Sequence, residues 1–482
     1  MKKIGYQKAW DCMLYLSIDH SKETGFIYKQ VYEGIKNGIL SGRITSDEKL
    51  PSKRNLAGQL NVSVNSIATA YEQLLAEGYI YSKERSGYFV ENMKELIQHE
   101  PAGQYTLPDD LRENKERDDD WLSLSHMTAN MSLFPFKNWF RCQREAIINH
   151  QQELSEMAHP QGPYIVRETI SKMIALTRGV KSEPEQIVIG AGTHSLIRQL
   201  MELMKKEAVI AVENPGYARF YTLLKRLGRK VAPVALDKKG IDPAGIAAID
   251  ADLLSVTPSH QFPTGIIMPI SRRIELLNWA FKNKGRYIIE DDYDSEFKYR
   301  SDIIPSLQSL DSHNKVIYTG TFSKSMYPGF RISYMVLPPD LLRLYRERFQ
   351  DGMQYSNTLN LYTLHYFIQD GGYLRHVKKM NHHYEHNRGI LIEALKKRFK
   401  KDIEIDDIPA GLHLLAHFCS EKTYAEIEEH AKRQKLEIYT MKRFMLNGAE
   451  KHGKTIDLVI GFANIEANQI EEAVERLYRI LH

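Results

Sequence analysis

Strands and helices alternate regularly over the middle of this 482-residue chain. Residues 185–204 and 207–228 each read as an apolar strand, a turn with glycine and a helix, and further apolar strands follow. Strands that are apolar throughout, with helices between them, are typical of a mostly parallel sheet covered by helices on both faces. Ligands of such sheets bind beyond the carboxyl ends of the strands. We therefore expect an α/β fold with its functional residues in the loops at that edge.

Three chemically distinctive features follow these strands. Asp291 and Asp292 come directly after one strand, Lys324 comes shortly after another, and the sequence GAGT (190–193) opens a helix after a third. A lysine amine forms a Schiff base with an aldehyde, a carboxylate can keep a pyridine nitrogen protonated, and helix-opening amides bind phosphate. Each feature alone is weak evidence. Their combination at one edge predicts pyridoxal 5'-phosphate as the cofactor.

The first 90 residues have a different pattern, with apolar residues at helical spacing from Ile27 to Ile39. Two shorter helices follow, the first beginning at Pro51, and residues 79–91 alternate apolar and polar around ERSG, which is typical of a hairpin. Two helices with a tight turn and a hairpin form a winged helix-turn-helix, which binds double-stranded DNA. The residues expected to contact DNA are Lys53, Arg54, Asn65, Ser66, Lys83 and Arg85.

The small polar residues that open the second of these helices have an alternative role. Ser63 is expected to cap that helix, and capping is also the alternative for Asn65. Residues 91–120 are charged, contain two prolines and lack periodicity, which predicts a linker. We therefore expect a DNA-binding domain over 1–90 and a ligand-binding domain over 121–482, with a large part at about 121–340 and a smaller part at about 341–482.

Composition narrows the class of protein further. The chain is 43% hydrophobic and 26% charged, and no stretch is apolar enough to span a bilayer, so we expect a cytoplasmic protein without a membrane partner. Its three cysteines form no CxxC pair, so neither a disulfide framework nor a metal site is expected. The net charge of +4 is compatible with DNA binding but does not argue for it.

The motifs together resemble a known family. The segments EDDYDSEF, TGTFSK, NPGY and TPSHQFPTG resemble fold-type I aminotransferases, and the winged helix over residues 51–79 resembles the GntR type. The combination is similar to the MocR subfamily of GntR-type transcriptional regulators, most closely to its GabR-like members, over nearly the whole chain. The resemblance implies a winged helix-turn-helix fused to a fold-type I aminotransferase-like domain.

The resemblance also implies roles for individual residues. Lys324 would carry the cofactor as an internal aldimine, Asp291 would pair with the pyridine nitrogen, and Tyr293 would approach the ring hydroxyl. Sequence leaves Asp292 open as the alternative to Asp291, because either of two adjacent carboxylates can face inward. The phosphate would be held by Gly192, Thr193, Thr321 and Arg331, with Tyr217 stacked on the ring.

Two arginines and one departure from the family pattern bear on the ligand. Arg219 and Arg443 occupy the places where GabR-like proteins bind the effector carboxylate, and a guanidinium fork suits a carboxylate. His126 is expected to be a satisfied structural histidine. Phe262 stands where aminotransferases commonly have an asparagine, which puts efficient transamination in doubt.

The leading functional hypothesis is a DNA-binding regulator that senses a small amino acid. By resemblance this effector is γ-aminobutyrate, which would displace Lys324 to form an external aldimine, and the regulator would be a domain-swapped homodimer. One alternative is a working aminotransferase with an accessory DNA-binding domain. Another is a regulator of vitamin B6 synthesis that senses pyridoxal 5'-phosphate itself.

Overall fold

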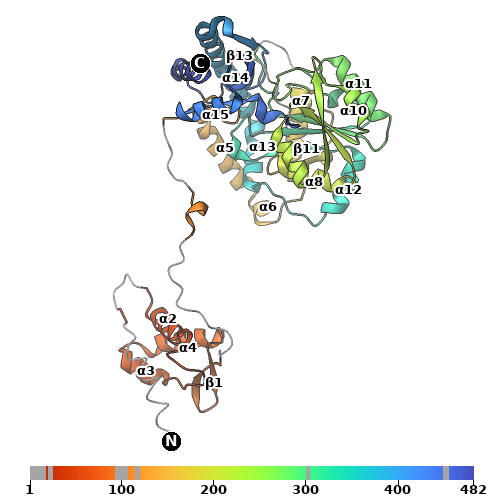
Figure 1. Cartoon of the computed structure of the whole chain (residues 1–482). Helices are drawn as coiled ribbons and strands as arrows, with labels where there is room; N and C mark the ends of the chain where they lie inside the picture. Colours follow the sequence, from red (N-terminus) through yellow and green to blue (C-terminus); the bar gives the residue numbers. More distant parts are fainter. Residues whose placement is uncertain (1–17, 20–24, 93–106, 114–119, 300–303, 449–454) are drawn as a thin grey trace. The chain divides into compact units, whose positions relative to one another are not determined.

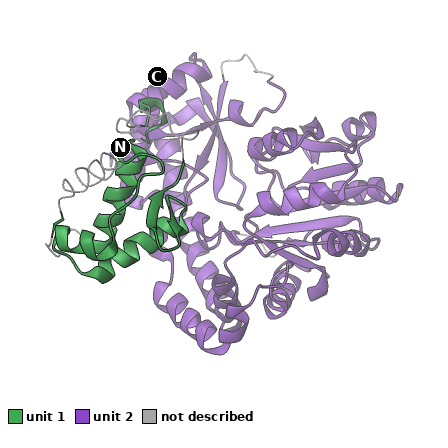
Figure 2. Cartoon of the chain, turned by 90° about the horizontal axis from the view of Figure 1, so that it is seen from below, with its two compact units in different colours: residues 1–117 green, residues 118–482 purple. Residues whose placement is uncertain are grey.

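The computed structural model describes residues 18–19, 25–92, 107–113, 120–299, 304–448 and 455–482 (Figure 1). The chain divides into two compact units, residues 1–117 and 118–482, which Figure 2 colours separately. Most of the predicted linker, residues 91–120, lies outside the described residues. None of the helices in the described ranges combines the length and apolar composition that crossing a bilayer requires.

The first unit contains the elements of a winged helix-turn-helix. Its helices are α2 (Ile27–Leu40), α3 (Lys53–Leu60) and α4 (Val64–Ala76), and its antiparallel hairpin consists of β1 (Ile80–Lys83) and β2 (Gly87–Val90). Tyr71 of α4 is fully buried among apolar side chains from all three helices, and its hydroxyl donates to the carbonyl of Pro51 at 2.9 Å. This core fixes α3 and α4 against each other.

Two details of the helix starts refine the sequence prediction. Helix α3 begins at Lys53 with Ser52 as its cap, so Pro51 precedes the helix and does not occupy its first turn. Ser63 caps α4, as predicted, because its side chain accepts a hydrogen bond from the backbone N–H of Ser66 at 3.0 Å.

The second unit is built on an eight-stranded sheet in the order β4-β11-β10-β9-β8-β5-β6-β7. The strands from β10 through β6 run parallel, whereas β11 and β7 are antiparallel to their neighbours, so the sheet is mostly parallel as predicted. The edge pair β6–β7 was not among the predicted strands. The strands are β4 (Ile187–Gly190), β5 (Val209–Asn214), β6 (Lys230–Asp237), β7 (Gly240–Ile241), β8 (Leu253–Val256), β9 (Tyr287–Asp292), β10 (Val316–Thr321) and β11 (Ser333–Val336).

Helices cover both faces of this sheet. On one face Ile289 and Ile317 pack with α8 (Thr193–Leu203), α9 (Ala218–Arg226) and α12 (Pro339–Phe349). On the other face Ile288 and Val316 pack with α10 (Pro243–Ala248) and α11 (Ile270–Phe281). Further along that face lie α5 (Phe136–Asn149), α7 (Tyr164–Arg178) and α13 (Thr358–Gln369). Because adjacent residues of each strand face opposite layers, both layers must be apolar, which explains the uninterrupted apolar strands.

A smaller four-stranded antiparallel sheet lies towards the C-terminus, in the order β12-β13-β16-β15. It shares a core with α14 (Gly372–Phe399), α15 (Tyr424–Arg433) and α16 (Ile470–Leu481). Its strands are β12 (Ile403–Asp406), β13 (His413–Cys419), β15 (Tyr439–Thr440) and β16 (Thr455–Gly461). The short strand β3 (Leu122–Ser123) pairs with β14 (Leu436–Glu437), which ties the start of this unit to its smaller part.

A buried ion pair joins α7 to the end of β9. The Arg178 Nε lies 2.6 Å from the Asp292 Oδ2, and the two side chains are 5% and 1% exposed. The Tyr318 hydroxyl donates to the same carboxylate oxygen at 2.5 Å. Asp292 is therefore held beneath the sheet, away from solvent.

Breaking this pair should cost much of the unit's stability. Replacing Arg178 by Met leaves an uncompensated buried carboxylate, so we expect the free energy of unfolding of residues 118–482 to fall by about 3–5 kcal/mol. Guanidinium unfolding of the full chain, followed by far-UV circular dichroism, measures this change. Lys172→Met, which removes the exposed pair with Glu168, is the matched control and should change stability by less than about 1 kcal/mol.

Candidate functional site

A cavity of about 370 Å³ opens at the carboxyl ends of the parallel strands. Loops that follow β8, β9 and β10 contribute to its wall, together with the start of α8 and the segment before β11. The wall contains three cationic side chains and a single carboxylate, so it favours anionic ligands. The lining residues are His126, Met127, Thr193, His194, Tyr217, Arg219, Phe220, Thr257, Phe262, Asp291, Tyr293, Thr321, Ser323, Lys324, Pro328 and Arg331.

Lys324 projects into this cavity from the loop after β10. Its Nζ donates a hydrogen bond to the backbone carbonyl of His126, which follows β3 in the chain. Burial lowers the pKa of the Lys324 amine to about 8, although the Asp294 carboxylate opposes this shift. A larger share of this amine than of a free lysine amine is therefore neutral near pH 7 and able to attack a carbonyl group.

Of the two adjacent carboxylates, Asp291 faces the cavity. It lines the wall, accepts a hydrogen bond from the Thr319 hydroxyl at 3.1 Å, and has a pKa raised to about 6 by burial. Asp292 points to the opposite side of the strand, where Arg178 and Tyr318 hold it. The alternation of side chains along β9 thus separates two residues that the sequence alone left equivalent.

A cradle of hydroxyl groups forms at the start of α8. The hydroxyls of Thr193, Ser333 and Thr321 make a continuous chain, with oxygen separations of 3.4 and 2.8 Å. Arg331 lies beside it and donates to the carbonyl of Ala191 at 3.3 Å. Gly192 suits this position because its φ is +95°, and because a Cβ would lie 1.9 Å from the Arg331 Nη2 and displace the guanidinium. Hydroxyls, a guanidinium and a helix N-terminus together suit a phosphate.

Tyr217 and Arg219 enter the cavity from the NPGY turn before α9. Gly216 permits this turn, since a Cβ there would lie 2.1 Å from the carbonyl oxygen of Glu213. The turn is tied to a distant segment, because the Gly216 N–H donates to the carbonyl of Phe444 at 3.0 Å and the Leu446 N–H donates to Asn214 Oδ1 at 2.9 Å.

Arg443 belongs to that distant segment but does not line the cavity. Its guanidinium lies 4.7 Å from the centre of the Tyr439 ring. Its charge nevertheless reaches His126, whose pKa falls to about 3 mainly through burial, with contributions from Lys324, Arg219 and Arg443. The two predicted effector arginines are therefore both near the site, and Arg219 alone contributes to the wall.

His126 lies in the cavity wall, which the sequence did not indicate. We expected a satisfied structural histidine, but the imidazole lines the cavity and its buried Nδ1 has no hydrogen-bond partner among the described residues. Its ring contacts those of Phe262 and Tyr439, with centroids 5.0 and 4.8 Å apart. The only signal in the sequence was its position near the start of the second domain.

Phe262 and Tyr293 form part of the aromatic wall beside Asp291. The two rings meet edge to face at 6.0 Å, and Phe262 also contacts Tyr217 at 5.8 Å. Phe262 has no polar atom in its side chain, so it adds no hydrogen-bonding group to this part of the wall.

The predicted DNA-contacting residues, all in the first unit, differ in their exposure to solvent and in their side-chain contacts. Arg54, Asn65, Lys83 and Arg85 are exposed. Lys53 lies 3.7 Å from a carboxylate oxygen of Glu72, and the Ser66 hydroxyl is 2.9 Å from that of Ser63. The Ser66 side chain thus already participates in the helix cap, whereas the four exposed residues are accessible to a partner.

Comparison with known proteins gives the family. Residues 121–477 match the aminotransferase class I and II family, and residues 27–90 match the gntR family of bacterial regulatory proteins. The chain is 36% identical to the uncharacterized HTH-type transcriptional regulator YdeL of Bacillus subtilis over 94% of this chain and 96% of that protein. It is 27% identical to the probable rhizopine catabolism regulatory protein MocR of Rhizobium meliloti, over 94% and 93% of the two chains. The chain belongs to the MocR subfamily of GntR-type regulators.

Solved structures support the fold of the second unit of this MocR-type regulator. The α-aminoadipate aminotransferase LysN of Thermus thermophilus superposes with a TM-score of 0.66 at 21% identity, covering 75% of this chain and 92% of that one. The prediction of a fold-type I aminotransferase-like domain is thereby confirmed.

The aminotransferase class I and II domain implies pyridoxal 5'-phosphate as the regulator's cofactor. The residues of the cavity fit this group. A buried amine, a carboxylate on the wall and a cradle for phosphate match its aldehyde, its pyridine nitrogen and its phosphate in turn.

The two carboxylates of β9 should respond differently to neutralisation. Asp291→Asn removes the charged partner expected for the pyridine nitrogen, so we expect cofactor affinity to fall about ten-fold or more with little change in stability. Asp292→Asn should instead lower the unfolding midpoint, because it disrupts the pair with Arg178. Absorbance titration with pyridoxal 5'-phosphate and denaturant unfolding measure the two effects, and the reverse pattern would assign the cavity to Asp292.

The phosphate cradle can be tested through Gly192. Gly192→Ala should displace the Arg331 guanidinium, whose Nη2 occupies the space that a Cβ requires. We expect weaker binding of pyridoxal 5'-phosphate and unchanged binding of unphosphorylated pyridoxal, measured by equilibrium titration of both compounds. Gly228→Ala is a control for substitution of a positive-φ glycine where nothing lies within 4 Å of the added Cβ. Equal losses for both ligands in Gly192→Ala would contradict the role of this cradle.

Proposed function

We propose that this regulator binds operator DNA through its winged helix and senses a small amino acid in the cavity of its second unit. The observation that carries this proposal is that Lys324 and Arg219 share one cavity. A ligand with a primary amine and a carboxylate can then present one group to the lysine-linked cofactor and the other to a guanidinium. γ-Aminobutyrate is the candidate ligand, by resemblance to GabR-like members of the family.

Different residues of the chain would bind different groups of the cofactor and the ligand. Pyridoxal 5'-phosphate, when bound, supplies an aldehyde that exchanges one primary amine for another. Lys324 would hold that group when no ligand is present, Asp291 would keep its ring nitrogen protonated, and Thr193, Thr321 and Arg331 would hold its phosphate. Arg219 on the wall and Arg443 near it, whose charges both act on His126, would attract the ligand's carboxylate. Contacts that exist only with ligand bound supply the free energy to shift a conformational equilibrium.

Catalysis by the same cavity is the second candidate function. The lowered pKa of Lys324, caused by burial, gives it the character of a general base as well as a nucleophile. Phe262 opposes turnover, because it offers no hydrogen bond where aminotransferases commonly have an asparagine. Steady production of a keto acid from an amine and a 2-oxo acid would identify a working aminotransferase. A change in DNA affinity caused by the cofactor alone would instead identify a sensor of pyridoxal 5'-phosphate.

We also propose that the regulator is a homodimer with exchanged domains, as the family resemblance implies. Helix α5 supports an apolar contact between copies, because several of its large side chains are exposed among the described residues. These are Phe136, Phe140, Ile147 and Ile148. The mass of the protein in solution, measured by sedimentation equilibrium, tests the dimer.

The sensing proposal predicts separable effects of three variants. Arg219→Met should weaken the ligand-dependent change in the cofactor's visible absorption by about ten-fold to a hundred-fold, because it removes a charge-assisted hydrogen bond, while cofactor affinity is retained. Arg443→Met should act in the same direction with a smaller effect, since Arg443 does not line the cavity. Lys324→Ala should lose the absorption band of the covalent linkage while its basal DNA affinity stays close to native.

The experiment follows absorbance and DNA affinity in the same titration. The purified protein is titrated with γ-aminobutyrate, and its affinity is measured for a duplex that it has itself selected from a random library. Arg226→Met, on the same helix as Arg219 but outside the cavity wall, is the matched control. Loss of cofactor binding equal to the loss of ligand response in Arg219→Met would overturn its role. A ligand that changes the spectrum without changing DNA affinity would overturn the sensing function.

A further inference from the structure

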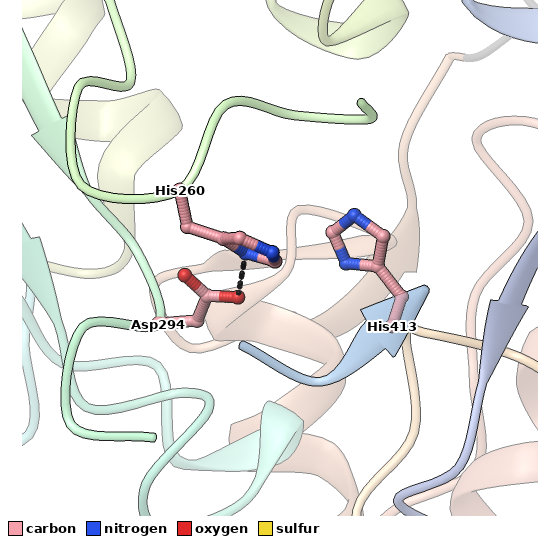
Figure 3. A group of neighbouring side chains, drawn as sticks. All are labelled: His260, Asp294 and His413. Atoms are coloured by element: carbon pink, nitrogen blue, oxygen red, sulfur yellow. Dashed lines mark hydrogen bonds and ion pairs between the residues drawn. The ribbon is translucent and has the colours of Figure 1, made fainter. Parts of the chain in front are cut away.

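A buried polar cluster lies behind Tyr293, outside the cavity wall. It consists of His260 after β8, Asp294 after β9 and His413 at the start of β13, which are 2%, 2% and 3% exposed (Figure 3). One ligand-type atom from each lies within 4.8 Å of the others, although no sequence motif indicated such a group. Neither binding of the cofactor nor binding of the ligand, as proposed above, has used these residues.

The hydrogen bonds of the cluster limit where the hydrogen of the Tyr293 hydroxyl can point. The Nδ1 of His260 lies 2.9 Å from the Asp294 Oδ2, and the dashed line in Figure 3 marks this pair. An ionised carboxylate accepts only, so Nδ1 carries a hydrogen and donates. The Tyr293 hydroxyl oxygen lies 3.1 Å from the same Nδ1 and therefore acts as a second acceptor. Because the Tyr293 oxygen accepts from His260, the hydrogen of the same hydroxyl can be donated to a different acceptor.

The phenolic hydrogen of Tyr293 can point in either of two directions, towards Asp294 or into the cavity. Burial raises the pKa of Tyr293 well above its usual value, and Asp294 adds to this by its charge and as a hydrogen-bond acceptor. The second direction is the cavity, whose wall includes Tyr293. The His260 N–H already donates to the Oδ2 of Asp294, so the phenolic hydrogen shares that carboxylate with it, whereas an acceptor in the cavity would bind the phenolic hydrogen without that competition.

Two glycines leave room for the His260 ring. A Cβ on Gly411 would lie 2.2 Å from Nδ1, and a Cβ on Gly265 would lie 3.3 Å from Nε2. Both glycines have positive φ angles, +72° and +78°, so each permits its loop conformation as well as the space for the ring. Within this space the hydrogen bond from Nδ1 to Asp294 orients the ring.

The same contacts argue against a bound metal ion. The Nε2 of His413 lies 3.2 Å from the carbonyl oxygen of Pro263 and donates to it, so that nitrogen carries a hydrogen and cannot coordinate a metal ion. A divalent cation placed here would have Asp294 as its one carboxylate ligand in the cluster and would be repelled by the Lys324 amine in its charged form, whose field already reaches His413.

We propose that His260, held by Asp294, is a positioning residue that turns the Tyr293 hydroxyl into the cavity as a hydrogen-bond donor to the ring oxygen of the cofactor. This inference rests on the proposed function, since it assigns a partner within that cofactor site. A donor to the ring oxygen stabilises the form of the bound group whose linkage nitrogen is deprotonated. The Tyr293 hydroxyl, positioned by His260, would therefore set the pH at which the linkage to Lys324 changes its protonation.

A pair of variants tests this through the visible spectrum. His260→Asn places an amide N–H near the position of Nδ1, whereas His260→Gln places it nearer that of Nε2. In the cofactor-loaded protein, we expect His260→Gln to raise the pH midpoint of the spectral change by about half to one pH unit, and His260→Asn to stay close to native. Tyr293→Phe should raise the midpoint similarly, and adding His260→Gln to it should have no further effect.

Two further measurements do not depend on the bound cofactor. Nitrogen-15 NMR of histidine-labelled, cofactor-free protein should show His260 as the neutral tautomer with hydrogen on Nδ1, the signal being assigned by its loss in His260→Asn. Metal analysis of the purified protein should find no stoichiometric metal. Hydrogen on Nε2 alone, or bound metal that is lost in His413→Asn, would overturn the positioning role.

The outcomes separate this inference from the proposed function. An unchanged midpoint in a coloured His260→Gln protein would overturn the positioning role and leave the cofactor site intact. A native protein that stays colourless with pyridoxal 5'-phosphate would overturn both. Additive shifts in the double variant would show that His260 acts by a route other than Tyr293 and would also overturn the proposal.

Discussion

The alternation of side chains along β9 is the constraint on which the cavity depends. Glu290 and Asp292 share one face of the strand, where Glu290 accepts the backbone N–H groups of Leu307 and Gln308 at 2.7 and 2.8 Å and Asp292 pairs with Arg178. With both neighbours anchored beneath the sheet, Asp291 can only face the opposite side. The chemistry of the site therefore rests on an ion pair that never touches the ligand.

Burial then gives the cavity its chemical character. The same loss of water that raises the pKa of Asp291 to about 6 lowers that of Lys324 to about 8. The two shifts act in opposite senses because desolvation disfavours whichever form is charged. Desolvation thus shifts both groups towards their neutral forms at physiological pH. For the amine this matters because only a neutral amine attacks an aldehyde.

Much of this organisation was predictable from sequence, because it depends on local patterns. Strand and helix order follows from apolar periodicity, and Lys324, Asp291 and Thr193 share an edge because parallel strands end together. The choice between Asp291 and Asp292 was not predictable, since it depends on Arg178, more than a hundred positions away. His126 and the group around His260 were missed for the same reason. Their partners come from distant segments that no short motif records.

The hydrogen bonds between the NPGY turn and residues 444–446, one between backbone groups and one to the Asn214 side chain, have a mechanical consequence. They cross-link the loop that supplies Tyr217 and Arg219 to the segment that carries Arg443, so the two cannot move independently while these bonds persist. A displacement of either segment would therefore be transmitted through these two hydrogen bonds to the turn that carries Tyr217.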